Sequence, residues 1–126
     1  MIRRAITTDK IAPSGGPFSA AVESGGSNLY LSGQVGQDPS TGQLVAGGVA
    51  RQAEQILRNA TAVLEAGGRS LADVLRVGVF LADIADFDAM NAVYVKFLDV
   101  PYPARTTVGV VALPLGARVE MDFVAR

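Results

Sequence analysis

One long amphipathic segment between two groups of short β-rich segments most constrains how this chain can fold. Over residues 49–66, apolar side chains recur at the spacing of one helical face, and two glycines end the pattern at residues 67 and 68. The apolar stripe consists of Ala53, Ile56, Leu57, Ala60, Val63 and Leu64. A helix that is apolar on one face must bury that face, and the neighbouring β-rich segments predict a sheet to cover it.

The segments around this helix predict the rest of the fold. Before it, strands are expected at residues 5–8, 18–23 and 28–33, the last two joined by a glycine-rich hairpin turn. After it, residues 74–81 alternate as a strand, and a second helix is expected from Asp83 or Asp86 to about Leu98. A final pair of strands is expected at residues 106–111 and 118–124, linked by residues 113–117.

This order predicts a single α+β domain over residues 1–126, with two helices on one face of a mostly antiparallel or mixed sheet. Hydrophobic residues make up 49% of the chain and the mean hydropathy is +0.30, although no apolar run approaches the ~18 residues of a membrane span. We therefore expect partner chains to cover the second face of the sheet. The amino terminus carries no secretory signal, which favours the cytoplasm.

The missing residue types restrict the chemistry. The chain has no cysteine and no histidine, which excludes thiolate nucleophiles, Ser-His-Asp triads and most transition-metal sites. Dinucleotide, P-loop and calcium-loop motifs are also missing, so no metal or cofactor is expected. A net charge of −1 and a pI of about 5.3 argue against nucleic acid as the main partner. An enzyme would have to use arginine, carboxylate, hydroxyl, amide and backbone groups.

Three polar residues are candidates for a site, each with a plainer interpretation. Arg105 follows a proline-rich loop at the start of a strand, where its planar fork could bind a carboxylate or phosphate. The plainer interpretations are an exposed charge at a strand end and a structural ion pair. Glu120 faces away from the apolar side of the last strand, where it could simply pair with Arg118. Asn91 lies beside the stripe of the second helix and could be an exposed amide. Glycines at 33 and 36 permit close approach to the backbone.

Several segments together resemble the RidA/YjgF (Rid) family over nearly the whole chain. They are residues 6–9, 16–22, 30–35, 52–67, 87–94, 103–108 and 113–124. The resemblance implies a chorismate-mutase-like fold and a homotrimer with clefts between subunits. It also implies cofactor-free hydrolysis of enamine and imine acids, such as 2-aminoacrylate, 2-iminopropanoate and 2-iminobutanoate, to 2-oxo acids and ammonia.

The resemblance also implies roles for particular residues. Arg105 corresponds to the residue that binds the substrate carboxylate, and Glu120 to the acid that holds water and the nitrogen end. The cleft would further be lined by Phe18, Ser32, Gly33, Asn91 and Thr107. Phe18 replaces a frequent tyrosine and so lacks a hydroxyl, and Thr107 stands where some members carry cysteine.

The separation of Arg105 and Glu120 favours a shared site. If the last two strands formed one hairpin, Glu120 would lie opposite about Val110, some ~16 Å from Arg105 at ~3.3 Å per residue. We therefore expect the two side chains to meet across a subunit interface. Three alternatives stay open: a hydrolase for a larger enamine such as an aminomuconate or aminoacrylate derivative, a non-catalytic trimer that binds small carboxylates or proteins, and a translation-inhibiting ribonuclease.

Overall fold

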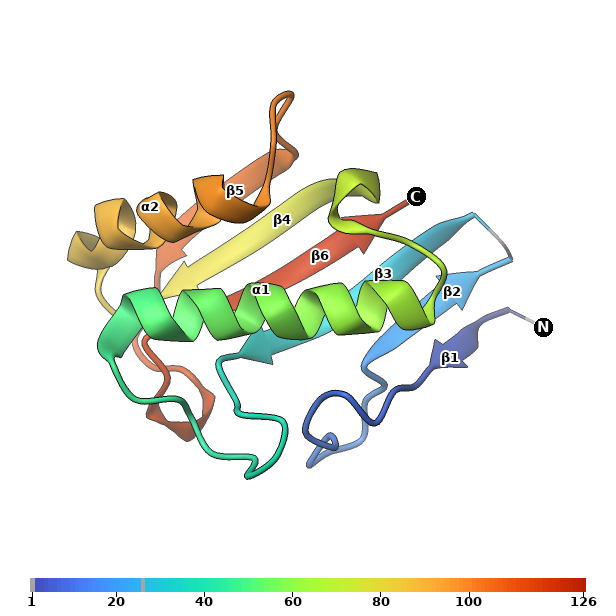
Figure 1. Ribbon diagram of the computed structural model, residues 1–126, viewed down its shortest axis with the longest axis horizontal. Helices are drawn as coiled ribbons and strands as arrows, with labels where there is room; N and C mark the ends of the chain where they lie inside the picture. The colour runs from blue at the N-terminus through green and yellow to red at the C-terminus, as the bar shows by residue number, and fades with distance from the viewer. Residues whose placement is uncertain (1, 26) are drawn as a thin grey trace.

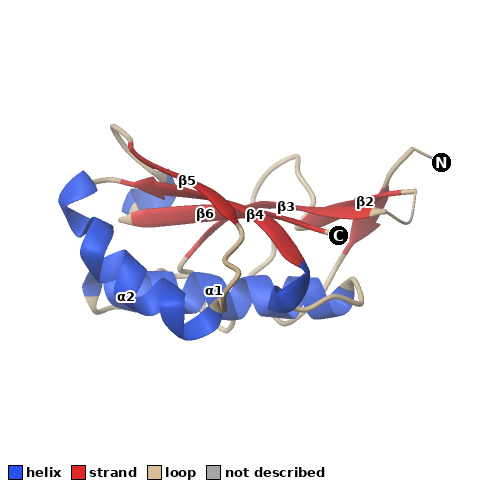
Figure 2. Ribbon diagram, turned by 90° about the horizontal axis from the view of Figure 1, so that it is seen from above, coloured by secondary structure: helices blue, strands red, loops and turns tan. Residues whose placement is uncertain are grey.

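The computed structural model describes residues 2–25 and 27–126, in which six strands form one mixed sheet and two α-helices cover one of its faces (Figures 1 and 2). The strands are β1 (Arg4–Ile6), β2 (Ala21–Ser24), β3 (Asn28–Val35), β4 (Val74–Leu81), β5 (Ala104–Gly109) and β6 (Val119–Ala125). The helices are α1 (Gly48–Ala66) and α2 (Phe87–Phe97), with 3₁₀ turns η1 (Leu71–Asp73), η2 (Ile84–Asp86) and η3 (Pro114–Gly116). The predicted α+β class and the two helices on one face are confirmed.

The pairing of the last strands differs from the sequence prediction. The order in the sheet is β1-β2-β3-β6-β4-β5, so β5 and β6 do not form a hairpin. β5 pairs in parallel with β4, and β6 lies between β3 and β4, antiparallel to both. The reason is that α2 connects β4 to β5, and a strand–helix–strand connection returns the chain in the same direction. The segment after β5 then carries the chain back past β4.

Several element boundaries also differ. The first strand is Arg4–Ile6 rather than residues 5–8, and β2 begins at Ala21 rather than residue 18. Asp83 caps η2, because its Oδ1 accepts a hydrogen bond from the Ala85 amide at 2.9 Å, and α2 itself begins at Phe87. The predicted end of α2 near Leu98 and the span of α1 agree with the structure.

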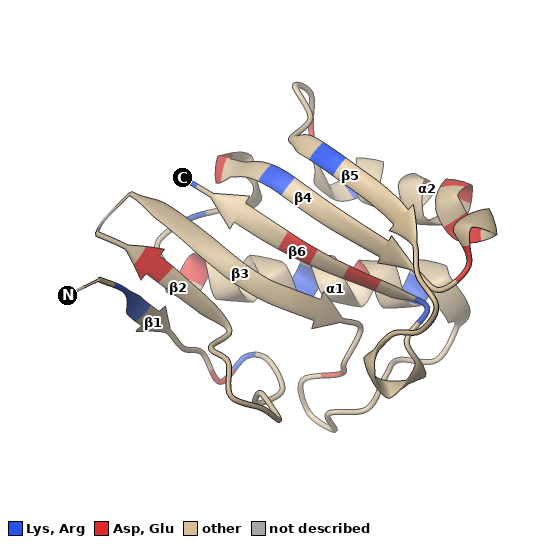
Figure 3. Ribbon diagram, turned by 180° about the vertical axis from the view of Figure 1, so that it is seen from behind, with Lys and Arg blue, Asp and Glu red and all other residues tan. Residues whose placement is uncertain are grey.

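The core lies between the helices and the sheet. Val119, Met121 and Phe123 point from the central strand β6 into this layer, where they are almost fully buried against the apolar stripe of α1. The alternate positions, Glu120 and Asp122, belong to the other face of the sheet. Figure 3 views the molecule from that face, with both helices behind the sheet. Neither α1 nor α2 covers that side (Figure 2). Over the described ranges, no helix is both long and apolar enough to span a membrane.

Buried amides on α1 hold two connecting segments in place. Gln52 Oε1 accepts a hydrogen bond from the Arg118 amide at 2.9 Å, and Asn59 Nδ2 donates to the Gln37 carbonyl at 2.9 Å. A Cβ on Gly36 would lie 2.8 Å from the Cα of Gln52, so the close approach predicted at this glycine is present. These contacts fix the entry to β6 and the segment after β3.

A cluster of opposite charges links β1 and β2 to the segment after α1. Glu23 on β2 pairs with Arg4 on β1 and with Arg69, which follows α1. The side chains of Glu23 and Arg69 are only 13% and 12% exposed. Arg69 also donates hydrogen bonds to the carbonyls of Ser27, Gly67 and Arg126. This cluster therefore connects the β2–β3 turn, the end of α1 and the carboxyl terminus.

Candidate functional site

The predicted site residues other than Thr107 divide between two cavities on opposite sides of the sheet. One, of about 580 Å³, is lined by Glu120 together with Phe18, Ser32 and Gly33, and we call it the Glu120 cavity. The other, of about 260 Å³, is lined by Arg105 and Asn91 and is called the Arg105 cavity. The family resemblance implied that these residues line a cleft between subunits, and the single chain supplies two separate cavities.

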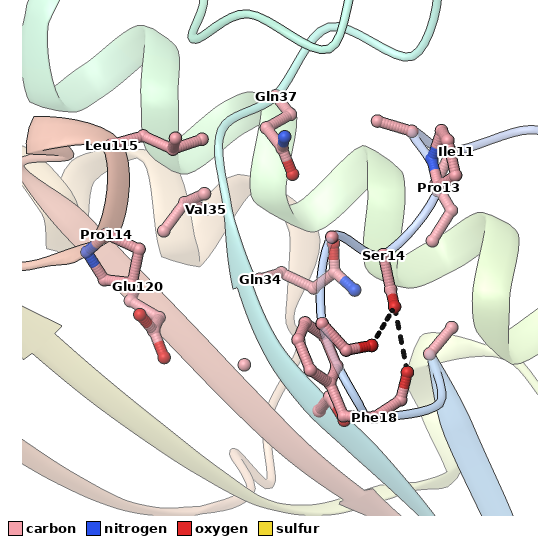
Figure 4. Close-up of a pocket in the computed structure, with 16 residues that line it drawn as sticks. Ile11, Pro13, Ser14, Phe18, Gln34, Val35, Gln37, Pro114, Leu115 and Glu120 are labelled. Atoms are coloured by element: carbon pink, nitrogen blue, oxygen red, sulfur yellow. Dashed lines mark hydrogen bonds between the residues drawn. The ribbon is translucent and has the colours of Figure 1, made fainter.

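The Glu120 cavity lies where β3 and β6 meet the loop before β2 (Figure 4). Val35 pairs with Glu120 across the two strands, and both line the cavity. The hydroxyl of Ser32 donates to the Ser19 carbonyl at 2.6 Å, so it holds the loop that carries Phe18. η3 adds Pro114 and Leu115 to the wall. The single carboxylate thus shares the cavity with apolar side chains and with the polar side chains of Ser14, Ser32, Gln34 and Gln37.

Gly33 has a specific role in this arrangement, because it leaves room for Glu120. A Cβ on Gly33 would lie 2.2 Å from Glu120 Oε2, closer than atoms can approach without displacement. The pairing register shifts between Leu31 and Gln34, which brings the glycine backbone against the carboxylate. The predicted close approach to Gly33 is therefore present.

The environment of Glu120 favours its neutral form. Burial, and secondarily the negative charge of Asp122, raise the pKa of Glu120 above its ordinary value of 4.5. The alternative of an ion pair with Arg118 is wrong, because Arg118 pairs with Asp86 at 2.8 Å. A carboxyl group with a raised pKa in a cavity is suited to accept and return protons.

The Arg105 cavity is built from α2 and the loop before β5. Tyr94, Val95, Tyr102 and Pro103 line it with Arg105 and Asn91. The Arg105 guanidinium carbon lies 4.7 Å from the centre of the Tyr94 ring and 5.6 Å from that of Phe87. Within residues 2–25 and 27–126, no carboxylate lies within 4.0 Å of Arg105, so it forms no ion pair there. The side chain is half-buried over two rings, so it is not simply an exposed charge either. Its donors are available to a ligand.

Two buried hydroxyls lie near Arg105. Among the described residues, Thr107 Oγ1 and Tyr94 Oη have no hydrogen-bond partner. Burial raises the pKa of the Tyr94 phenol, an effect that the charge of Arg105 partly opposes. Thr107 lies two residues from Arg105 on β5 but lines neither cavity. Buried hydroxyls without a protein partner are uncommon, and water or a ligand is the usual partner in such cases.

Sequence reasoning missed Phe87 and Tyr94 as site residues. Both were assigned to the apolar stripe of the second helix, and Tyr94 is indeed buried. Their spacing of seven residues places both rings on one side of α2, which is the side that the Arg105 guanidinium contacts. The signal was therefore present, but its use required knowing that β5 packs over α2.

Arg105 and Glu120 are far apart within one chain. Arg105 pairs with Val77 and Glu120 with Phe80 on the strand between them, so they are three residues apart along β4 and lie on either side of it. These spacings correspond to about 10 Å along and about 10 Å across the sheet. Their side chains also point to opposite faces. The predicted separation is present, although the hairpin register opposite Val110 is wrong.

Comparison with known proteins shows the family. The family described as Endoribonuclease L-PSP matches residues 7–126, and the chain therefore belongs to this family, the RidA/YjgF family that the sequence resembles. A human protein named 2-iminobutanoate/2-iminopropanoate deaminase is 45% identical over 99% of this chain and 90% of its own.

Solved structures share the fold. RidA from an Antarctic Psychrobacter species is 44% identical, with a TM-score of 0.93 over 97% of this chain and 98% of its own. Escherichia coli TdcF, solved with bound serine, is 34% identical, with a TM-score of 0.91 over 97% of each chain.

Proposed function

We propose that this chain is a hydrolase that deaminates 2-iminopropanoate, 2-iminobutanoate and 2-aminoacrylate to 2-oxo acids and ammonia without a cofactor. The observation that carries the proposal is the state of Arg105: its guanidinium lies over two aromatic rings in a cavity and has no acidic partner within the described ranges. The name of the human relative supports this choice of substrates.

The proposed chemistry needs only the groups that the chain supplies. Arg105 binds the substrate carboxylate with two parallel hydrogen bonds, while Asn91 lines the same cavity. Glu120 accepts a proton from water, whose oxygen forms a bond to C2 of the imine. Glu120 then returns this proton to nitrogen. The remaining hydroxyl proton passes to the same nitrogen through Glu120 as the C–N bond breaks, so ammonia leaves and C2 becomes a ketone. General acid–base catalysis of this kind contributes about 10²–10⁴-fold.

The separation of the two cavities leads us to propose a homotrimer in which each site is shared. The sheet face that carries Glu120 is left open by both helices, and exposed apolar side chains such as Tyr30 and Val108 lie on its strands. A second chain packed against this face could bring its Arg105 cavity to the Glu120 cavity of the first. Gly33, Ser32 and Phe18 would then contribute from one chain, and Asn91, Arg105 and Thr107 from the next.

The direct test is ammonia and 2-oxo acid release from imines generated in situ by an amino-acid oxidase. Arg105→Lys should lower kcat/KM about 10–100-fold, because lysine lacks the second parallel donor and a charged hydrogen bond is worth about 1.5–3 kcal/mol. Arg58→Lys is the matched control, since Arg58 also lies over an aromatic ring of α2, Phe97, but lines neither cavity. Full activity of the Arg105→Lys variant would refute the proposed role.

The shared site has its own test. Arg105→Ala and Glu120→Ala chains, each inactive alone, are co-refolded in equal amounts. If neighbouring chains share each site, about a quarter of the sites in randomly mixed trimers should be intact. No recovery of activity in verified mixed trimers would refute the shared site.

The alternative of a protein that only binds small carboxylates is tested separately, because the related TdcF was solved with bound serine. Calorimetry with serine and 2-oxobutanoate distinguishes the two. Binding that depends on Arg105, without turnover of any imine, would support the binding function over the hydrolase.

A further inference from the structure

The Glu120 cavity has two large apolar side chains at its wall whose purpose the reaction alone does not explain. Phe18 comes from the loop before β2 and Leu115 from η3, and both line the cavity with Glu120 (Figure 4). They are 54% and 63% exposed, so neither is placed there mainly to fill the core. Because both side chains line the cavity beside the carboxylate, they are positioned to contact an apolar group of a ligand.

The loop around Phe18 is fixed before any ligand binds. The Phe18 amide donates to the Gly16 carbonyl at 2.8 Å. The Ser14 hydroxyl lies 3.1 Å from the Gly16 carbonyl oxygen and 2.9 Å from that of Phe18 (Figure 4). A Cβ on Gly16 would lie 3.1 Å from the Phe18 ring, so the ring packs directly on this turn. The ring is therefore a preformed wall rather than a freely moving side chain.

Leu115 is held in a conformation that leucine rarely adopts. Its φ of 62° is the only left-handed value of a non-glycine residue in the described ranges. The following Gly116 also has a positive φ, of 69°, and Pro114 precedes both. A strained backbone at an exposed apolar residue gives no gain in core packing, and strain of this kind concentrates at ligand sites.

We propose that Phe18 and Leu115 form an apolar subsite for the substrate side chain, so that imine acids with branched or longer apolar side chains are preferred over 2-iminopropanoate. This inference rests on the proposed function, in which Arg105 and Glu120 account for the carboxylate and the C=N group. The substrate side chain is then the only part of the imine acid that differs between possible substrates. A single methyl group fills little of a cavity of about 580 Å³. Phenylalanine, unlike tyrosine, offers that side chain no polar group.

The test compares the imines of leucine and alanine, generated in situ by the same amino-acid oxidase. Each extra buried methylene should raise kcat/KM by roughly fourfold. The wild type is therefore expected to favour the leucine-derived imine at least ~10-fold. Leu115→Asn should abolish most of this preference, because asparagine tolerates a left-handed backbone and removes only the apolar character. Phe18→Tyr should reduce the preference several-fold.

Val111→Asn is the matched control, because Val111 is fully exposed on the same segment but lines neither cavity. It should keep the wild-type preference. Equal kcat/KM values for the two imines in the wild type, or a preference unchanged in both subsite variants, would overturn the subsite while leaving the deaminase function intact. Failure to hydrolyse either imine would overturn the deaminase function and the subsite with it.

Discussion

The stacking of Arg105 on Tyr94 makes a quantitative prediction about substrate binding. The guanidinium carbon lies 4.7 Å from the Tyr94 ring centre, and a cation–π contact is worth about 0.5–1 kcal/mol when exposed and about 2 kcal/mol when desolvated. Arg105 is half-buried, which places the contact near ~1 kcal/mol. Tyr94→Leu should therefore raise KM about fivefold with little change in kcat, because the carboxylate is bound equally in the ground and transition states.

Two further variants distinguish the effect of losing the Tyr94 ring from the effect of losing its hydroxyl and from general destabilisation of α2. Tyr94→Phe keeps the ring and should leave KM within about twofold of wild type. Phe97→Leu also removes a ring from α2, but that ring lies under Arg58, so KM should not change. Because Tyr94 is only 3% exposed, Tyr94→Leu will also lower the melting temperature. The kinetics are therefore measured well below the melting temperature of each variant.

The decisive measurement is the energetic coupling between Tyr94 and Arg105 in substrate binding. In a double-mutant cycle, Tyr94→Leu should have little further effect on KM once Arg105 is lysine, because the flat cation that the ring supports is gone. An unchanged KM in Tyr94→Leu would refute the reasoning. So would an equal rise in KM for Tyr94→Phe, which would assign the effect to the hydroxyl.

Three other variants test separate parts of the structure. Gly33→Ala should lower kcat at least ~10-fold with an unchanged circular dichroism spectrum, because the new Cβ would displace the Glu120 carboxylate; wild-type kcat would contradict this. The raised pKa of Glu120 adds stability only below its unfolded pKa, and that contribution is lost as pH rises through the folded value. Glu120→Gln should therefore melt higher than wild type at pH 7, with a gap that closes below pH 4.5, and an equal melting temperature at pH 7 would count against burial as the cause. Hydrogen bonds from Arg69 and Arg4 lower the pKa of Glu23, so its contribution is present above its unfolded pKa and lost as pH falls through the folded value. Glu23→Gln should melt lower than wild type at pH 7 and approach it in acid, and a constant gap across pH would show that charge is not responsible.

The sequence predicted the parts of the fold that depend on local patterns. The apolar stripe of α1 and the glycines after it lie within one segment, so the spacing alone located this helix. Strand pairing is not local. β5 and β6 are close in sequence and look like a hairpin, but nine residues separate them, longer than common hairpin loops. The helix predicted between β4 and β5 already favoured parallel pairing of those two strands.

In the candidate site too, local patterns predicted some features, whereas others depend on non-local packing. Alternation along β6 placed Glu120 opposite the core, and the family resemblance predicts a ligand-binding role for Arg105. Tyr94 was assigned to the core because a buried aromatic residue on a helix stripe has the same pattern whether or not it supports a charge. Only the packing of β5 over α2 shows that Arg105 lies on this ring.

The placement of Arg105 and Glu120 excludes one way of building a complete site. The sheet lies between the two side chains, since Arg105 points toward α2 and Glu120 toward the open face. Their strands are both hydrogen-bonded to β4, so bringing the residues together within one chain would require breaking that pairing. A loop movement cannot achieve this. A substrate of three or four carbons that contacts both residues therefore requires a second chain, and the mixed-chain experiment follows from the topology as well as from the chemistry.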